Sequence, residues 1–272
     1  FMERLAKAAG GAAAAAALLP VLQNNYAEAA IVPEDDPRLV TEMATYEVDG
    51  VTMSGYLARP KGDGKLPAVI VIHENRGLND WARSMADQIA EMGYIALAPD
   101  FLSGTAPNGG GTADYENPDA ARTGIYGLDP EQITATLNAS VAYAKNIPAS
   151  NGKVAVIGFC WGGSQSFNFA TAAPDIEVTI VCYGTGPQNE ADYQNIQVPV
   201  YGFYGGNDNR VNATIASSEA AMNAAQQIFE PVIYEGAGHG FFRAGEEANA
   251  SEANIKARAA GLERLKTILE NL

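Results

Sequence analysis

The feature that most constrains this fold is a series of unbroken apolar runs. They occupy residues 66–72, 94–98, 154–157, 178–183, 198–204 and 231–234. A continuous apolar run of this length is typical of a strand that is buried on both faces. Segments with helical spacing separate the runs, among them residues 81–92, 213–229 and 251–270. Strands that alternate with helices predict an α/β fold, with a mostly parallel, doubly wound sheet.

Two stretches do not follow this alternation of apolar runs and helical segments. Residues 46–58 alternate in polarity around Asp49-Gly50, which predicts an antiparallel hairpin at the N-terminal edge of the sheet. Residues 99–128 contain Pro and many Gly without a clear period, and we expect a long loop over one face of the sheet. Asp129-Pro130 then opens a helix that should run to about Lys145.

The N-terminal segment differs in composition from the rest of the chain. A charged start is followed by an Ala-rich run that is too short and too weakly apolar to span a membrane. The segment resembles the tail of a twin-arginine export signal, which would make the protein exported or periplasmic. The alternative, which leaves a cytoplasmic location open, is a retained helix that packs on the body or mediates a homodimer. We predict a helix and linker over residues 1–43 and the α/β domain over residues 44–272.

Charge and cysteine content exclude several classes of function. The net charge of −15 opposes binding to nucleic acid or to anionic membranes. The only two cysteines, Cys160 and Cys182, make no disulfide framework, and with two histidines in the chain no zinc spacing occurs. We therefore expect free thiols and no metal or cofactor.

Cys160 lies in Gly158-Phe-Cys160-Trp-Gly162, directly after a buried run and before a helix. This is the strand–turn–helix pattern of the nucleophile elbow of α/β hydrolases, with Cys in place of Ser. The flanking glycines allow a tight turn that exposes the sulfur. The N-terminus of the following helix should favour the thiolate. Cys182 lies within an apolar run and lacks the flanking glycines, as expected for a buried structural thiol.

A thiol nucleophile needs a base and an orienting acid, which this fold supplies in the chain order nucleophile, acid, histidine. After Cys160 the one histidine is His239, in a glycine-rich loop past the last run. Asp208 follows the preceding run in Gly205-Gly-Asn-Asp208. Each residue alone could be an ordinary loop or turn residue. Their positions at successive strand ends predict a Cys160–His239–Asp208 triad.

His73-Glu-Asn-Arg-Gly77 follows the first buried run, where this fold takes its second oxyanion donor. We expect the backbone N–H groups of Asn75 and Trp161 to form the oxyanion pair. Glu74 should lie near the thiol and hold it protonated at rest, or be displaced when substrate arrives. The alternative for Glu74 is an ion pair with Arg76 or Arg243.

The sequence resembles the dienelactone hydrolase family (carboxymethylenebutenolidase-like) over residues 44–272. The resemblance rests on five motifs: Val71-Ile-His-Glu-Asn-Arg-Gly77, Gly93-Tyr-Ile-Ala-Leu-Ala-Pro-Asp100, Gly152-Lys-Val-Ala-Val-Ile-Gly-Phe-Cys-Trp-Gly-Gly163, Gly205-Gly-Asn-Asp208 and Gly238-His-Gly-Phe-Phe-Arg243. It implies an α/β-hydrolase fold, the triad named above, and a Glu at position 74 that contacts the resting thiol and takes part in its activation. It also implies that Arg243 binds a substrate carboxylate. Arg122 is a candidate for a second such arginine, and Arg76 marks a branch whose substrates need not be dienelactones.

We therefore predict a cofactor-independent hydrolase of small esters or lactones. Two alternatives remain at this point. One is a thioesterase or peptidase on the same fold, with residues 101–128 covering the site. The other is a non-catalytic binding or scaffold protein that uses its N-terminal helix as an interaction arm.

Overall fold

The computed structural model describes residue 32 and residues 36–172 and 174–272. The predicted N-terminal helix and its role in a homodimer lie outside these residues. The first strand begins at Leu39, inside the range predicted as linker. Among the described helices, none has the length and apolarity needed to cross a membrane.

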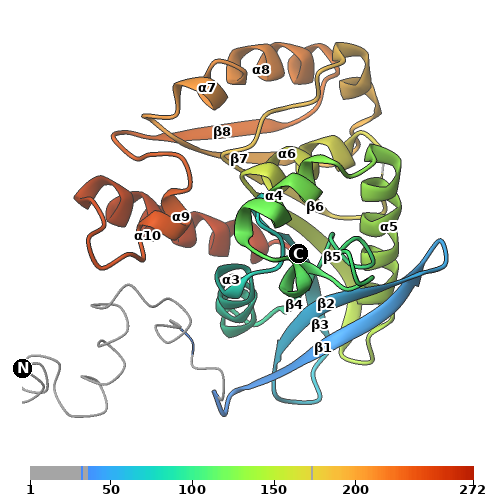
Figure 1. The fold of residues 1–272 in the computed structure, drawn as a ribbon. Coiled ribbons are helices and arrows are strands. Elements are labelled where there is room, and N and C mark those ends of the chain that lie inside the picture. The colour runs from blue at the N-terminus through green and yellow to red at the C-terminus, as the bar shows by residue number, and fades with distance from the viewer. Residues whose placement is uncertain (1–31, 33–35, 173) are drawn as a thin grey trace, which may run out of the picture.

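One eight-stranded sheet organises the molecule, in the order β1-β2-β4-β3-β5-β6-β7-β8 (Figure 1). The strands are β1 Leu39–Val48, β2 Val51–Pro60, β3 Leu66–Ile72, β4 Ile95–Pro99, β5 Ser150–Phe159, β6 Val178–Cys182, β7 Val200–Gly205 and β8 Phe229–Tyr234. From β4 to β8 all neighbouring strands pair in parallel, whereas β1 pairs with β2 and β2 with β4 in antiparallel fashion. The predicted sheet and N-terminal hairpin are both confirmed.

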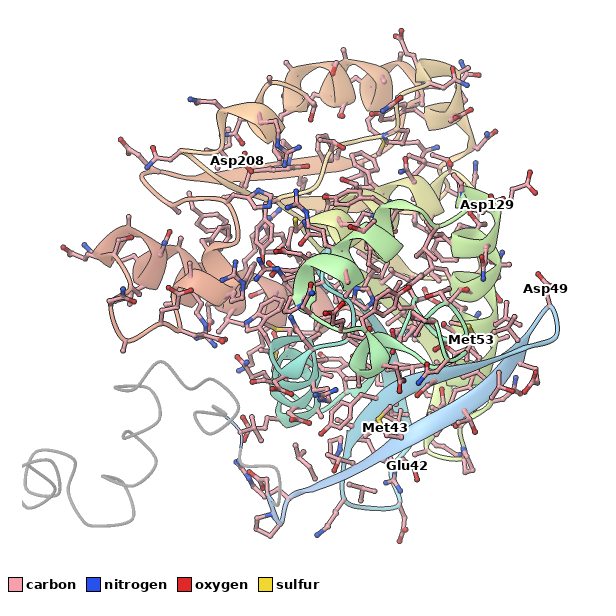
Figure 2. All side chains as sticks on the ribbon, in the orientation of Figure 1. Glu42, Met43, Asp49, Met53, Asp129 and Asp208 are labelled. Carbon is pink, nitrogen blue, oxygen red and sulfur yellow. The ribbon has the colours of Figure 1, made fainter. Side chains whose placement is uncertain are left out.

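The hairpin turns at Asp49 and Gly50, which both have positive φ (48° and 83°). Figure 2 shows Asp49 at its tip, away from the body of the molecule. The alternating pattern gives the hairpin two different faces, because Met53 is buried whereas Met43 is 54% exposed. The hairpin therefore extends the sheet at the edge opposite to β8.

Helices cover both faces of the sheet. They are α3 Asp80–Glu91, α4 Pro118–Tyr126, α5 Pro130–Asn146, α6 Trp161–Ala170, α7 Asn209–Asn212, α8 Ile215–Ala224, α9 Phe241–Ala244 and α10 Glu252–Leu269, with 3-10 turns η1 Thr112–Asp114 and η2 Glu190–Asn195. Successive residues of β3 show the two layers. Ile70 and Ile72 belong to one buried cluster together with residues of α5, α6 and α8. Val69 and Val71 belong to the other, with residues of α3 and α10.

The segment from residue 99 to residue 128 differs from the prediction of a long irregular loop. It contains helix α4, whose first turn is capped by Asn117: the side chain accepts hydrogen bonds from the N–H groups of Asp119 and Ala120. Pro118 occupies the first helical turn, where its missing N–H costs nothing. This helix lies over the carboxyl ends of the strands and supplies one wall of the site described next (Figure 1).

Candidate active site

Cys160 stands on a strained turn between β5 and α6. Its backbone has φ 57° and ψ −113°, a conformation that side-chain-bearing residues rarely adopt. The turn is fixed on both sides, because the Cys160 N–H donates to the carbonyl of Cys182 (3.0 Å) and the Cys160 carbonyl accepts from the N–H of Ser164 (3.2 Å). The predicted elbow geometry is therefore present. Cys160 is half-buried at this position, whereas Cys182 is fully buried in β6.

The glycines around Cys160 allow close contact between main chains. A Cβ on Gly158 would lie 1.9 Å from the carbonyl oxygen of Gly162. A Cβ on Gly162 would lie 2.5 Å from the carbonyl oxygens of both Ile72 and His73. Contacts of this length are impossible for real Cβ atoms, so glycine is required at both positions. The close packing brings the start of α6 against the end of β3, from which Glu74 and Asn75 emerge.

His239 and Asp208 meet as predicted. The imidazole Nδ1 lies 2.5 Å from Oδ2 of Asp208, a carboxylate that is only 7% exposed. Because the carboxylate accepts, Nδ1 carries the proton and Nε2 is left as the basic nitrogen. The second carboxylate oxygen accepts from the N–H of Val211 (3.3 Å), which holds the group in place. The imidazole edge also packs against the buried ring of Tyr183, with ring centroids 5.1 Å apart.

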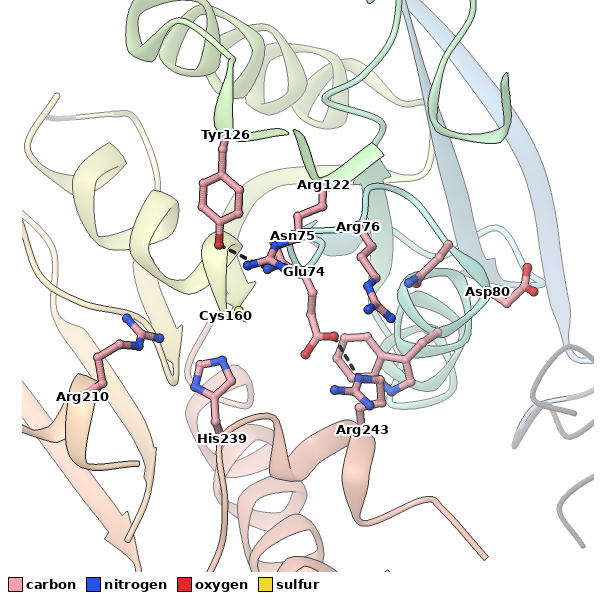
Figure 3. A pocket seen from close by; sticks show the side chains of 12 residues that line it. Glu74, Asn75, Arg76, Asp80, Arg122, Tyr126, Cys160, Arg210, His239 and Arg243 are labelled. Atoms are coloured by element: carbon pink, nitrogen blue, oxygen red, sulfur yellow. Dashed lines mark hydrogen bonds and ion pairs between the residues drawn. The ribbon is translucent and has the colours of Figure 1, made fainter. Parts of the chain in front are cut away.

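Cys160 and His239 line the same cavity of about 780 Å³. Figure 3 shows the imidazole pointing into this space toward the elbow. Within the described part of the chain, no hydrogen bond joins the thiol to the imidazole. The remaining lining residues are Glu74, Asn75, Arg76, Asn79, Asp80, Trp81, Arg122, Tyr126, Arg210 and Arg243. All the side chains predicted for the site thus face one cavity, with two exceptions. Asp208 lies behind His239, and Trp161 was predicted to act through its backbone.

Glu74 forms an ion pair with Arg243, whose Nε donates to Oε2 at 2.9 Å (Figure 3). This was the alternative considered for Glu74 from the sequence. The ion pair leaves Glu74 close enough to the sulfur to act on it. Burial and the charge of Glu74 together raise the pKa of Cys160 to about 11, against a smaller lowering by the Trp161 N–H, which donates to the sulfur. The N–H of Trp161 at the N-terminus of α6 does favour the thiolate, as predicted, but burial and the charge of Glu74 outweigh this effect in the resting site.

The thiol's reactivity should therefore increase when the charge of Glu74 is removed. Glu74→Gln takes away a negative charge that raises the pKa of Cys160, so more thiolate is present at neutral pH. We expect alkylation of Cys160 by iodoacetamide at pH 7.5 to become several-fold faster, measured by intact mass spectrometry. Glu263→Gln on the exposed side of α10 removes the same charge far from the cavity and serves as the control. Equal alkylation rates in both variants would show that Glu74 does not hold the thiol protonated.

His73 lies behind the site as a buried link between strand ends. Its Nδ1 donates to the carbonyl of Glu74 (2.7 Å), and its Nε2 accepts from the N–H of Phe101 (3.4 Å). The ring stacks on the indole of Trp161 at 5.6 Å. Burial lowers the pKa of His73, which matches the neutral tautomer that these two bonds require. His73 therefore fixes the backbone that carries Glu74 and Asn75.

The two predicted oxyanion donors have different surroundings. The Trp161 N–H points at the sulfur of Cys160. Among the described residues, no group accepts a hydrogen bond from the backbone N–H of Asn75. The side-chain amide of Asn75 donates to the hydroxyl of Tyr126 (3.2 Å). The N–H of Asn75 is thus available to an incoming oxygen, whereas the N–H of Trp161 is engaged by the sulfur at rest.

The sequence did not point to Arg210 and Tyr126 as site residues. Arg210 lies two positions after Asp208, at the start of α7, and its side chain lines the cavity. Tyr126 lies one helical turn after Arg122 on α4, and the guanidinium of Arg122 lies over its ring at 5.8 Å. Recognising α4 from its Asn117-Pro118 start would have placed Arg122 and Tyr126 on one face of a helix.

Among the residues that the structure describes, no group of three or more His, Cys, Asp or Glu side chains could hold a metal ion. The polar groups of the cavity instead include a thiol, a hydrogen-bonded imidazole and several guanidinium groups. Such groups suit acyl transfer to a thiol.

Comparison with known proteins agrees with this geometry. Residues 53–272 match the dienelactone hydrolase family. The chain belongs to this family. An Escherichia coli K12 protein provisionally named carboxymethylenebutenolidase is 30% identical over 239 residues, covering 80% of this chain and 86% of its own. Protein usf of Aquifex pyrophilus is 32% identical over 214 residues, covering 74% and 86%.

Solved structures of the same fold are also similar. The crystal structure of a dienelactone hydrolase-like promiscuous phosphotriesterase from metagenomic libraries has a TM-score of 0.73 at 23% identity, covering 86% of this chain and 99% of its own. Esterase 2 of Thermogutta terrifontis has a TM-score of 0.58 at 20% identity, covering 84% and 94%. The α/β-hydrolase fold is thereby confirmed. Family membership confirms the predicted enzyme class, an ester or lactone hydrolase.

Proposed function

We propose that this member of the dienelactone hydrolase family hydrolyses small anionic esters or lactones without a cofactor, using Cys160, His239 and Asp208 as a triad. One observation carries the proposal. A thiol on a strained elbow and an imidazole held by a buried carboxylate open into the same cavity. These are the nucleophile, the base and the orienting acid that covalent acyl transfer requires.

In the proposed reaction the thiolate of Cys160 attacks the carbonyl carbon and forms a tetrahedral oxyanion. The C–O bond to the alcohol portion then breaks, and the leaving oxygen takes the proton that the thiol gave up, which passes from Glu74 to Nε2 of His239 and from there to the oxygen. Water, deprotonated by the same imidazole, attacks the thioester. The C–S bond breaks, which releases the carboxylic acid and restores the thiol. In this scheme His239 acts first as acid and then as base, and Asp208 keeps its Nε2 facing the cavity.

The oxyanion would be bound by the N–H groups of Asn75 and Trp161. One of these N–H groups is free among the described residues, and the other already points at the sulfur. A donor of this kind typically contributes about 3 kcal/mol to the stabilisation of the transition state. Both N–H groups are held by the tight contact between α6 and the end of β3, so neither needs to move when the charge develops.

The raised pKa of Cys160 implies that the thiol is activated only when substrate is bound. Arg243 pairs with Glu74 at rest. An anionic group that enters the cavity can take over the guanidinium of Arg243, which releases the Glu74 carboxylate to accept the thiol proton. This exchange would restrict thiolate formation to the enzyme–substrate complex. It also explains why the cavity pairs a carboxylate with a thiol that must ionise.

Arg76 and Arg122 would help Arg243 to bind the substrate carboxylate. Both line the cavity, and within the described residues neither has a carboxylate at ion-pair distance. A cavity bordered by guanidinium groups is poorly suited to a long neutral acyl chain, because their desolvation would go uncompensated. This charge favours a small anionic ester or lactone over the fatty acyl groups of a thioesterase.

Trapping of the acyl-enzyme tests the proposal. The protein is mixed with an activated short ester such as 4-nitrophenyl acetate, quenched in acid, and analysed by intact mass and peptide mass spectrometry. We expect a single acetyl group on the peptide that contains Cys160, with stoichiometric burst release of nitrophenol. Turnover without any acylation of Cys160 would contradict the covalent mechanism. Stable acylation without turnover would favour a binding protein on a hydrolase fold.

A further inference from the structure

The cavity concentrates positive charge in an acidic protein. The chain has a net charge of −15 and only 17 Lys and Arg residues, yet four arginines line this one cavity. Of its two carboxylates, Glu74 is paired with Arg243 and Asp80 with Arg83. Three guanidinium groups remain without an acidic partner among the described residues: those of Arg76, Arg122 and Arg210. Charge that the protein does not neutralise itself is available to an anionic ligand.

These cations do not form one cluster. In Figure 3 the guanidinium of Arg210 lies on the side of His239, whereas Arg76 and Arg243 lie on the opposite side of Cys160, next to Glu74. Arg210 comes from α7 near the carboxyl end of β7, and Arg243 comes from α9 beyond β8. The cavity therefore presents positive charge on two sides of the nucleophile, an arrangement suited to a ligand with two anionic groups.

The position of Arg210 next to His239 indicates which portion of the substrate it would contact. His239 must protonate the leaving oxygen, so the alcohol portion of the substrate lies on the side of the imidazole. The acyl portion then extends in the other direction, toward Glu74, Arg76 and Arg243. Arg210 is also close enough to the sulfur for its charge to lower the pKa of Cys160.

We propose that Arg210 forms a second anion subsite, which binds a carboxylate on the alcohol portion of the substrate. This inference rests on the proposed function and adds to it. The preferred substrate would carry one anionic group on the acyl portion, bound by Arg243 with Arg76 or Arg122, and another on the alcohol portion, bound by Arg210. A half-ester of a dicarboxylic acid with a hydroxy acid, or a lactone with carboxylates on both sides of its ring oxygen, has this form.

The surroundings of Arg210 support a role in binding ligand rather than in folding. Its side chain is exposed, and among the described residues it makes no hydrogen bond, ion pair or ring contact. By contrast, Arg264 and Arg258 are held by backbone carbonyls and by Glu246, respectively. An exposed side chain without such partners can be replaced with little effect on the fold, so the subsite can be tested by substitution.

The test uses two matched pairs of aryl esters. The first pair consists of the acetate esters of 3-hydroxybenzoate and 3-hydroxybenzamide, which differ only in the charge on the alcohol portion. The second pair consists of phenyl hemisuccinate and phenyl succinamate, which differ only in the charge on the acyl portion. For each pair the ratio of kcat/KM, charged over neutral, is measured. A ratio cancels any general effect of Arg210 on the reactivity of Cys160.

We expect Arg210→Gln to lower the first ratio about tenfold, the effect of losing one charge-assisted hydrogen bond, and to change the second ratio less than about twofold. Arg210→Lys should keep most of the first ratio. Arg59 lies on β2 and does not line the cavity. Arg59→Gln removes one positive charge there and should change neither ratio. An unchanged first ratio in Arg210→Gln, or an equal fall of both ratios, would overturn the subsite. If the wild-type protein cleaves none of the four esters, the proposed hydrolase function fails and the subsite fails with it.

Discussion

Cys160→Ala should abolish hydrolysis of activated esters, with kcat at least about 10⁴-fold lower, because Cys160 is the only Cys, Ser or Thr among the described residues that line the cavity. The substitution removes one sulfur atom from a half-buried position and leaves the hydrogen bonds of the turn in place. We therefore expect the fold to survive. Steady-state release of nitrophenol and the thermal unfolding midpoint, measured on the same preparation, separate loss of chemistry from loss of structure.

Cys182→Ala is the matched control. Cys182 is fully buried in β6, so its truncation should cost about 1 kcal/mol of stability while turnover remains. The two variants thus predict opposite outcomes: Cys160→Ala is folded and inactive, Cys182→Ala active and slightly less stable. A Cys160→Ala protein with wild-type rates would refute the covalent mechanism, and a Cys182→Ala protein that is folded but inactive would contradict the purely structural role of Cys182.

The sheet could be predicted from the sequence because parallel strands buried on both faces leave a pattern that few other structures share. Residues 68–72 show this most clearly: alternate residues of β3 enter two different hydrophobic clusters, so each of these positions must be apolar. The Asp49-Gly50 turn was equally clear, since both residues must adopt positive φ. Element ends were less certain: the helix expected over residues 213–229 ends at Ala224.

Helix α4 was not predicted, although its start has the same chemistry as a start that was. Asn117-Pro118 and Asp129-Pro130 both place a capping side chain before a proline in the first turn. The many glycines between residues 104 and 111 obscured the first of these signals. Missing α4 meant that Tyr126 was overlooked and that Arg122 had no structural context.

The candidate site could be predicted as far as backbone topology determines it. Cys160, Asp208 and His239 follow strands β5, β7 and β8, and the parallel sheet brings those strand ends to one edge. Side-chain electrostatics could not be predicted in the same way. The pairing of Glu74 with Arg243, and the burial that raises the pKa of Cys160, depend on distances between residues far apart in the sequence. The proximity of Arg210 to the sulfur depends on such distances too.

Gly158→Ala should destabilise the protein by about 3 kcal/mol or more, because the added methyl cannot avoid the main chain. Its Cβ would lie 1.9 Å from the carbonyl oxygen and 2.3 Å from the carbonyl carbon of Gly162. No rotamer change can relieve a clash between a Cβ and backbone atoms, so either β5 or the first turn of α6 must move. Urea unfolding followed by circular dichroism measures the loss, and we expect ester hydrolysis to fall as well, because the elbow is displaced.

Gly64→Ala is the matched control for Gly158→Ala. Gly64 lies in the turn between β2 and β3, where an added Cβ meets nothing within 4 Å, so its replacement should change stability by less than about 0.5 kcal/mol. Neither Gly158 nor Gly162 has positive φ; the strained conformation belongs to Cys160 itself. The glycines are therefore needed for the close approach of α6 to β5 and β3, and not for an unusual dihedral angle. If Gly158→Ala were as stable and active as Gly64→Ala, the close approach would not be what holds the sulfur in position.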